Sequence, residues 1–241
     1  MSTDPLRPRL LSADEVGEPL LLPAAAILSA AGLYATLPTK FIAGPASGVF
    51  SLARVVVPAL TVLLLAALAL SFPQVRLVKK LDVQIDRIRV GRRVAVIGVT
   101  ALVSAANAAA IYLLVHLLVN GAHAQASQLL RAGIHMWCLN VLLFALWFWE
   151  LDGGGPIARR TVDRRDRDFV FPQELNPELA PENWRPLFLD YLYVSFTNAT
   201  AFSPTDTMPL SRWAKVLMMV ESAISLVLAL MVAARAVNIL R

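Results

Sequence analysis

Five apolar stretches, separated by polar segments, dominate the chain. Each is close to the roughly 20 residues that a helix needs to cross about 30 Å of hydrocarbon. The stretches cover residues 19–38, 49–72, 94–119, 132–149 and 213–239. The first is Ala-rich and is the weakest of the five. The pattern predicts an all-α fold: a polytopic transmembrane helical bundle that forms a single integral membrane domain over residues 1–241.

A sixth stretch, residues 187–203, has two interpretations. It is apolar enough to enter a membrane but too polar for a comfortable lipid-facing span. It either crosses as a short sixth span or dips in and returns as a re-entrant segment, covered by protein or water. A natural turn at Asp206, Thr207 and Pro209 slightly favours the crossing. The side of the membrane on which the C-terminus lies depends on this choice.

The composition agrees with a membrane protein. Of the 241 residues, 57% are hydrophobic and 16% are charged, and the mean hydropathy is +0.62. Soluble domains carry about 25% charged residues, and disorder needs low hydrophobicity, so the composition argues against a soluble globule and excludes a disordered chain. The net charge of +5 does not indicate nucleic-acid binding, because the basic residues cluster between the apolar stretches. The single cysteine, Cys138, allows no intrachain disulfide.

The basic residues predict the orientation of the bundle. The linker 73–93 carries seven Lys and Arg residues and the linker 150–187 carries six, whereas the linkers 39–48 and 120–131 carry one each. Basic residues gather on the cytoplasmic side of membrane proteins. We therefore expect both basic linkers and the N-terminus in the cytoplasm. We expect no signal peptide, because acidic residues stand where a basic n-region is needed.

Oxygen-bearing side chains are concentrated in and after the sixth stretch. Such oxygens suit cations such as Na⁺, K⁺ and Ca²⁺, and in a membrane they are expensive unless they face a partner or water. The residues expected to line an ion or solute path are Thr197, Asn198, Thr200, Ser203, Thr205, Asp206 and, from the last span, Glu221. The alternative is that these side chains hydrogen-bond neighbouring helices.

Glu221 lies in the interior third of the last predicted span. A carboxylate is costly there and is often functional. It would bind a proton or an ion, or pair with a cation such as Arg54 or Arg131. The alternative is a protonated or snorkelling carboxyl group held by neighbouring hydroxyls.

The sequence indicates no metal site and no cofactor. His116, His123, His135 and Cys138 are candidate ligands, and His135 and Cys138 share a helix face. They lack the paired spacing that is typical of zinc sites.

No enzymatic motif is present, so we expect no catalytic activity. The chain lacks a nucleophile elbow, a zinc-protease motif and a phosphate-binding glycine loop. The GGGP at residues 153–156 indicates the end of a helix. An enzyme would gain support if Glu150, Asp152, Asp190 and a histidine converged in a cytoplasmic cleft.

Four basic residues beside the third span are expected to face lipid headgroups: Lys79, Lys80, Arg92 and Arg93. Each such residue contributes roughly 1 kcal/mol near an anionic surface. The linker has apolar residues at near-helical spacing, which predicts an amphipathic helix on the membrane surface. The alternative is that these charges only set the topology. The expected partners are the lipid bilayer, including anionic lipids, and further copies of this chain.

The second half of the chain resembles a family of uncharacterised bacterial multi-spanning inner-membrane proteins, known mainly as a domain of unknown function. The resemblance covers roughly residues 90–241 and rests on FALWFWELDGGGP, DFVFPQ and WRPLFLDYLYVSFTNATAFSPTDTMPLS. It implies an all-helical bundle in a bacterial plasma membrane. It implies no established activity.

A shorter segment resembles the pore module of potassium channels. Asp206-Thr207-Met208-Pro209 is similar to the Asp-x-x-Pro that follows the filter, and Trp213 and Lys215 are similar to the residues that open the inner helix. The filter would then fall on residues 201–205, where the two glycines are absent and a proline replaces the tyrosine. Proline fixes φ and removes a donor, so a carbonyl-lined filter of that type is not expected. The predicted cytoplasmic position of the preceding linker also differs from that family.

These features lead to two hypotheses. The first is a channel- or transporter-like protein with a cation path lined by the polar residues of the sixth stretch and by Glu221. The second is a non-conducting structural or accessory protein that organises partners or anionic lipids. A path predicts Asn198, Thr200 and Glu221 on one water-accessible cavity, whereas the second hypothesis predicts that they are satisfied between helices.

Overall fold

The structure is mostly helical. It is a computed structural model that describes residues 21–36, 55–56, 58–60, 62–63, 82–119, 126–156, 158–160, 167–182, 184–201 and 206–239. The main helices are α1 (Leu21–Ala35), α3 (Asp82–Val119), α4 (Ala126–Leu151), α6 (Phe188–Ala201) and α7 (Arg212–Ile239). The shorter elements are the 3-10 helices η3 (Asp152–Gly154) and η4 (Ala158–Arg160), the strands β1 (Phe169–Val170) and β2 (Met208–Pro209), and the helix α5 (Pro172–Leu175).

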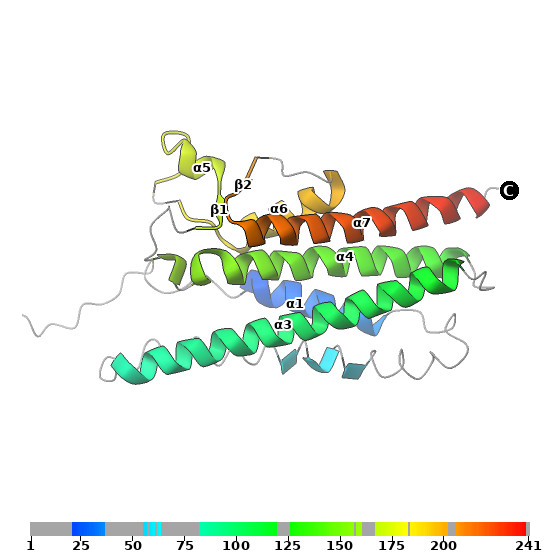
Figure 1. Ribbon diagram of the computed structural model, residues 1–241, viewed down its shortest axis with the longest axis horizontal. Coiled ribbons are helices and arrows are strands. Elements are labelled where there is room, and N and C mark those ends of the chain that lie inside the picture. The colour runs from blue at the N-terminus through cyan, green and yellow to red at the C-terminus, as the bar shows by residue number, and fades with distance from the viewer. Residues whose placement is uncertain are drawn as a thin grey trace, which may run out of the picture.

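Helix α4 is the centre of the bundle. It packs against α6 and α7 on one side and against α1 and α3 on the other, as Figure 1 shows. Gly133 lets α4 and α7 approach closely, because a Cβ atom there would lie 2.8 Å from a methyl group of Val232. Of the three long apolar helices that the structure describes, α4 accordingly has the largest buried share.

Three of the five predicted spans are confirmed as helices that are long and apolar enough to cross a membrane. They comprise Val96–His116 of α3, Leu130–Gly154 at α4 and Arg212–Ala234 of α7. The first predicted span corresponds to α1, which at 15 residues is shorter than the roughly 20 residues of a standard span. The second, residues 49–72, lies largely outside the described residues, and its described positions are helical.

Helix α3 extends beyond its apolar part. It runs for 38 residues, about 57 Å at 1.5 Å per residue. Residues 82–93, which overlap the linker segment for which a surface amphipathic helix was one of two interpretations, form its first turns. Of the basic residues expected to face lipid, Arg92 and Arg93 thus belong to α3, and Lys79 and Lys80 lie outside the described residues.

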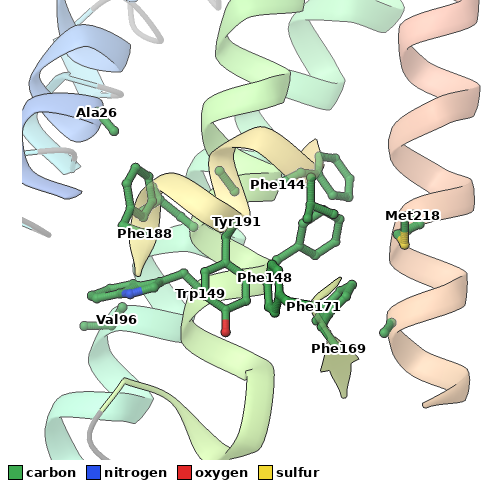
Figure 2. Close-up of a cluster of buried hydrophobic side chains, with 14 of the residues drawn as sticks. Ala26, Val96, Phe144, Phe148, Trp149, Phe169, Phe171, Phe188, Tyr191 and Met218 are labelled. Atoms are coloured by element: carbon green, nitrogen blue, oxygen red, sulfur yellow. The ribbon is translucent and has the colours of Figure 1, made fainter. Parts of the chain in front are cut away.

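An aromatic cluster fills the bundle near the end of α4. It consists of Phe144, Phe148, Trp149, Phe169, Phe171, Phe188 and Tyr191, all buried. Figure 2 shows these rings gathered between α4 and α6, with Met218 of α7 beside them. Several pairs meet edge to face, such as Phe171 and Tyr191, whose ring centroids are 5.3 Å apart. This geometry adds to the free energy gained by burying the rings.

Both flanks of α6 lie at the same end of the bundle. Strand β1 precedes α6 and strand β2 follows it, and the two strands pair antiparallel, with Phe169 opposite Pro209. The same end holds the end of α4 and the start of α7, as Figure 1 shows. In the sequence, α6 lies between α4 and α7. The chain therefore runs away from this end along α6 and returns to it at β2, before α7 begins.

Candidate functional site

Polar side chains form two separate networks in the α4–α6–α7 part of the bundle. The interior network consists of Ser195, Asn198, Glu221 and Ser222 together with nearby backbone oxygens. The end network consists of Asp152, Arg159, Asp168, Tyr191 and Trp213. The aromatic cluster, which contains Tyr191, lies beside the end network.

Glu221 and Asn198 are at the centre of the interior network. The Asn198 Nδ2 group donates to Glu221 Oε2 at 2.7 Å and to the Met218 backbone oxygen at 2.9 Å. Ser222 Oγ lies 3.1 Å from Asn198 Oδ1. Because a backbone oxygen only accepts, the Met218 contact fixes which way the Asn198 amide points. Both hydrogens of the amide are then used.

Ser195 links this pair to α4. Its hydroxyl contacts Glu221 Oε1 and lies 2.7 Å from the backbone oxygen of Val141. Ser195 and Glu221 are both fully buried, at 0% exposure. The interior network therefore joins all three helices at a depth that solvent does not reach in the described structure.

A further polar pair lies one turn along α7. Asn140 Nδ2 of α4 donates to Ser225 Oγ at 3.2 Å. Glu221 and Ser225 are four residues apart and thus share one face of α7. Sequence reasoning missed Asn140, Ser222 and Ser225, although the four-residue spacing of Glu221 and Ser225 was a signal that this face meets protein.

The other predicted path residues that the structure describes do not join Glu221. The Thr197 hydroxyl lies 2.8 Å from the backbone oxygen of Tyr193 in its own helix, and the Thr200 hydroxyl bonds that of Phe196. Asp206 is exposed and accepts a long bond of 3.4 Å from Thr207. Ser203 and Thr205 lie outside the described residues. Of the seven predicted positions, the structure thus brings together Asn198 and Glu221.

Asp152 is the hub of the end network. Its Oδ1 accepts the backbone N–H groups of Asp168 and Phe169 at 2.8 and 3.2 Å. Its Oδ2 accepts the Tyr191 hydroxyl at 2.5 Å and lies 3.8 Å from Arg159 Nη1. Asp152 is fully buried, so its negative charge is stabilised by these donors and by the nearby guanidinium group.

Arg159 is held in this buried position by several groups. Its Nη1 donates to the Trp149 backbone oxygen at 2.9 Å. Its guanidinium carbon lies 4.7 Å from the centre of the Tyr191 ring, a cation–π arrangement. Burial raises the pKa of Tyr191 well above its ordinary value near 10, the Arg159 charge opposes this shift, and the Asp152 charge adds to it. The phenol is therefore protonated and donates to Asp152.

Asp168 connects the end of α4 to the start of α7. Its Oδ2 accepts the Gly153 N–H at 3.1 Å, and its Oδ1 accepts the Trp213 indole N–H at 2.7 Å. The glycines that follow α4 have positive φ values of 55°, 83° and 98° at Gly153, Gly154 and Gly155. This left-handed backbone suits glycine and turns the chain sharply. The predicted helix end at residues 153–156 is confirmed.

The candidate catalytic acids do not form a cleft with a histidine in the described residues. Glu150 and Asp152 are buried. Asp190 Oδ2 accepts the Leu187 N–H at 2.7 Å at the start of α6. His135 contacts the Arg131 backbone oxygen of its own helix.

The candidate metal ligands that the structure describes do not gather into a metal site. No group of three His, Cys, Asp or Glu side chains is placed to hold a metal ion within the described ranges. The ring of His116 stacks at a tilt with Tyr112, and His123 lies outside the described residues.

No protein-family model, curated protein or solved structure matches this chain. The functional interpretation therefore rests on the geometry of the two networks.

Proposed function

We propose that this chain is a bacterial inner-membrane protein in which α6 is a re-entrant helix. The observation that supports this topology is the pairing of β1 with β2, which puts both flanks of α6 at one end of the bundle. At 14 residues, α6 is about 21 Å long, shorter than the roughly 30 Å of hydrocarbon that a span crosses. Five spans, with residues 19–38 and 49–72 as the first two, then put the C-terminus outside.

The end network lies on the cytoplasmic side in this proposal. Arg93 of the basic linker 73–93 lies close to Gly154 of the basic linker 150–187, and basic residues gather on the cytoplasmic side of membrane proteins. Exposed basic side chains at this end include Arg185, Arg212 and Lys215. They are available to anionic headgroups, each contributing roughly 1 kcal/mol near such a surface.

The proposed role is that of a non-conducting structural or accessory protein that organises partners or anionic lipids. The single observation that carries it is the Asn198–Glu221 pair. These two residues, which would line a cation path, instead use their polar atoms on one another, on Ser195 of α6 and on α7. Satisfied polar contacts between helices hold a membrane bundle together, and no catalytic constellation accompanies them in the described residues.

A flux measurement tests this role. The purified chain is reconstituted into proteoliposomes, and Na⁺, K⁺ and H⁺ gradients are applied to wild type, Asp206→Asn and Glu221→Gln. We expect all three to match protein-free liposomes. Flux that exceeds this background and falls in either variant, with circular dichroism showing intact helices, would overturn the non-conducting role.

A cation conduit is the second candidate, favoured by the topology. A short helix that enters and returns between two spans is the arrangement of pore loops in channels. Thr200 and Asp206 are exposed on the described chain, so a path would run between copies of it in a homo-oligomer. This candidate predicts flux only from preparations in which cross-linking detects an oligomer.

Binding of anionic lipid tests the accessory role directly. Thermal unfolding in detergent is followed with added anionic or zwitterionic lipid. We expect a larger rise in melting temperature with the anionic lipid, which is reduced when Arg212 and Lys215 are both replaced by Gln. Equal effects of the two lipids would contradict a role for these charges.

A further inference from the structure

The hydrogen bonds of Ser195 require a hydrogen that the serine does not have. Ser195 Oγ lies against two oxygens, the Val141 backbone oxygen at 2.7 Å and Glu221 Oε1. A serine hydroxyl has one hydrogen. The Val141 oxygen has none to give, so one of the two contacts lacks a hydrogen unless Glu221 supplies it.

The rest of the network assigns the missing hydrogen. Asn198 donates to Glu221 Oε2 at 2.7 Å, so this oxygen acts as an acceptor. Glu221 Oε1 faces the serine oxygen. A carboxylic acid with its hydrogen on Oε1 and its carbonyl at Oε2 satisfies every contact: Oε1 donates to Ser195, and Ser195 donates to Val141. An ionised carboxylate that accepted the Ser195 hydrogen would leave the Ser195 and Val141 oxygens facing each other at 2.7 Å without a hydrogen.

The surroundings of Glu221 also favour the neutral acid. The other titratable side chains of α4, α6 and α7 are Arg131, His135, Cys138, Glu150, Asp190, Tyr191, Tyr193, Arg212, Lys215 and Arg235. Among the described side chains, the groups that face Glu221 are the neutral Ser195 and Asn198, and no cation lies within ion-pair distance. Burying a carboxylate without a counter-charge costs several kcal/mol in effect, so the group takes up a proton instead.

We infer that Glu221 is a proton-binding site inside the bundle, and that its proton joins α7 to the re-entrant helix α6 through Ser195. The ligand of this site is a proton, which is bound at Oε1. Glu221 donates it to Ser195 in a hydrogen bond, and Ser195 in turn donates its own hydrogen to the Val141 oxygen of α4. Loss of the proton would remove the hydrogen bond from Glu221 to Ser195 and would leave a bare charge between three helices. Protonation of Glu221 is thereby coupled to the packing of α6 against α4 and α7. The inference is independent of whether the protein conducts.

Infrared spectroscopy tests this directly. A protonated carboxylic acid has a C=O stretching band that is separate from the bands of carboxylates and amides. We expect this band in the spectrum of wild type at neutral pH. It should be absent from the spectrum of Glu221→Gln, a substitution that keeps the size of the side chain. Glu174→Gln is the matched control, because Glu174 pairs with Arg167 and is expected to contribute no such band.

A second variant still tests the inference if Glu221→Gln does not fold. Ser195→Ala removes the acceptor of the proposed hydrogen bond, so the Glu221 band is expected to shift to higher frequency, with unchanged far-ultraviolet circular dichroism. A wild-type spectrum without a band that depends on Glu221 would overturn the inference. A Glu221 band whose position does not change in Ser195→Ala would overturn the assignment of its hydrogen-bond partner.

Discussion

Trp213 in the first turn of α7 donates its indole N–H to the carboxylate of Asp168 at 2.7 Å, across 45 positions of sequence. The same carboxylate accepts the Gly153 N–H just after α4. One side chain from the linker thus joins the end of one candidate span to the start of another. Because α6 lies between Asp168 and Trp213 in the sequence, this hydrogen bond helps to hold the two ends of the segment that contains α6 close together.

The Trp213–Asp168 bond is expected to contribute measurably to stability. Trp213→Phe keeps an aromatic ring and removes the donor to a charged acceptor, and such bonds contribute about 1.5–3 kcal/mol. We expect a loss of that size in the free energy of unfolding, measured by denaturant titration in detergent. The control is Trp147→Phe, whose indole donates to the neutral Ser104 hydroxyl at 3.0 Å and should cost about 0.5–1.5 kcal/mol. Equal losses would contradict a special role for Asp168.

Tyr191 predicts a loss of stability at high pH. Its pKa is raised above its ordinary value near 10 by burial, so above about pH 10 the unfolded chain releases the phenolic proton while the folded chain keeps it. The unfolded state then binds fewer protons, and the free energy of unfolding falls as the pH rises. We expect the decline to be shallower in Tyr191→Phe than in wild type, as measured by thermal unfolding across alkaline pH.

Tyr193→Phe is the control for that pH dependence. Tyr193 lies two residues further along α6, and its side chain is 50% exposed. Its removal should leave the alkaline decline of wild type unchanged. A Tyr193→Phe profile as shallow as that of Tyr191→Phe would show that the buried phenol is not the group responsible.

The sequence was sufficient to predict the long helices. The candidate spans in α3, α4 and α7 are continuous apolar runs, and their periods and lengths are local properties. The path of α6 was not predictable in this way, because it depends on Phe169 pairing with Pro209, 40 positions apart, and the local turn at Asp206 pointed slightly towards a crossing. A pair of two-residue strands has no sequence pattern strong enough to identify it.

The candidate site also contains residues that could be predicted from the sequence and contacts that could not. Asn198 and Glu221 stood out because polar groups are costly within apolar stretches, but nothing in the sequence paired them across α6 and α7. Thr197 and Thr200 bond backbone oxygens of their own helix, a habit of helical threonines that could have been anticipated. The end network joins Asp152, Asp168 and Trp213 through a long linker, and such contacts appear only once the chain is folded.

Asp152→Asn is expected to be among the most disruptive conservative changes in the end network. An asparagine side chain has one acceptor oxygen in place of two, so its NH₂ group would face the N–H or O–H donors that now bond Asp152. Arg159 would also lose its nearby negative charge. Breaking a buried charge pair costs about 3–5 kcal/mol. We expect a loss of that order in the free energy of unfolding. Asp206→Asn, at an exposed aspartate, should change stability by less than about 0.5 kcal/mol.

The turn after α4 should tolerate no side chain at Gly155. Its φ is 98°, and a Cβ atom there would lie 3.0 Å from the Glu150 backbone oxygen. Gly155→Ala is therefore expected to destabilise the protein by about 1–3 kcal/mol. Gly98→Ala is the opposite case, because Gly98 lies within α3 with nothing within 4 Å of its added Cβ, and it should gain about 0.5–1 kcal/mol. A neutral Gly155→Ala variant would contradict the tight turn.

The side of the membrane on which the C-terminus lies distinguishes a re-entrant α6 from one that crosses. A reporter fused after Arg241 should lie on the periplasmic side, because five spans starting from a cytoplasmic N-terminus end outside, whereas a sixth crossing would end inside. The orientation of the bundle itself needs an independent measurement. Leu179, which is 83% exposed after α5, is replaced in a Leu179→Cys variant that also carries Cys138→Ala, and the cells are treated with a membrane-impermeant maleimide. We expect this variant to be labelled only after the cells are opened, in either topology, since the basic linker is proposed to be cytoplasmic. A cytoplasmic reporter together with protection of the introduced thiol in intact cells would mean that α6 crosses, and labelling of that thiol in intact cells would mean that the whole bundle is inverted.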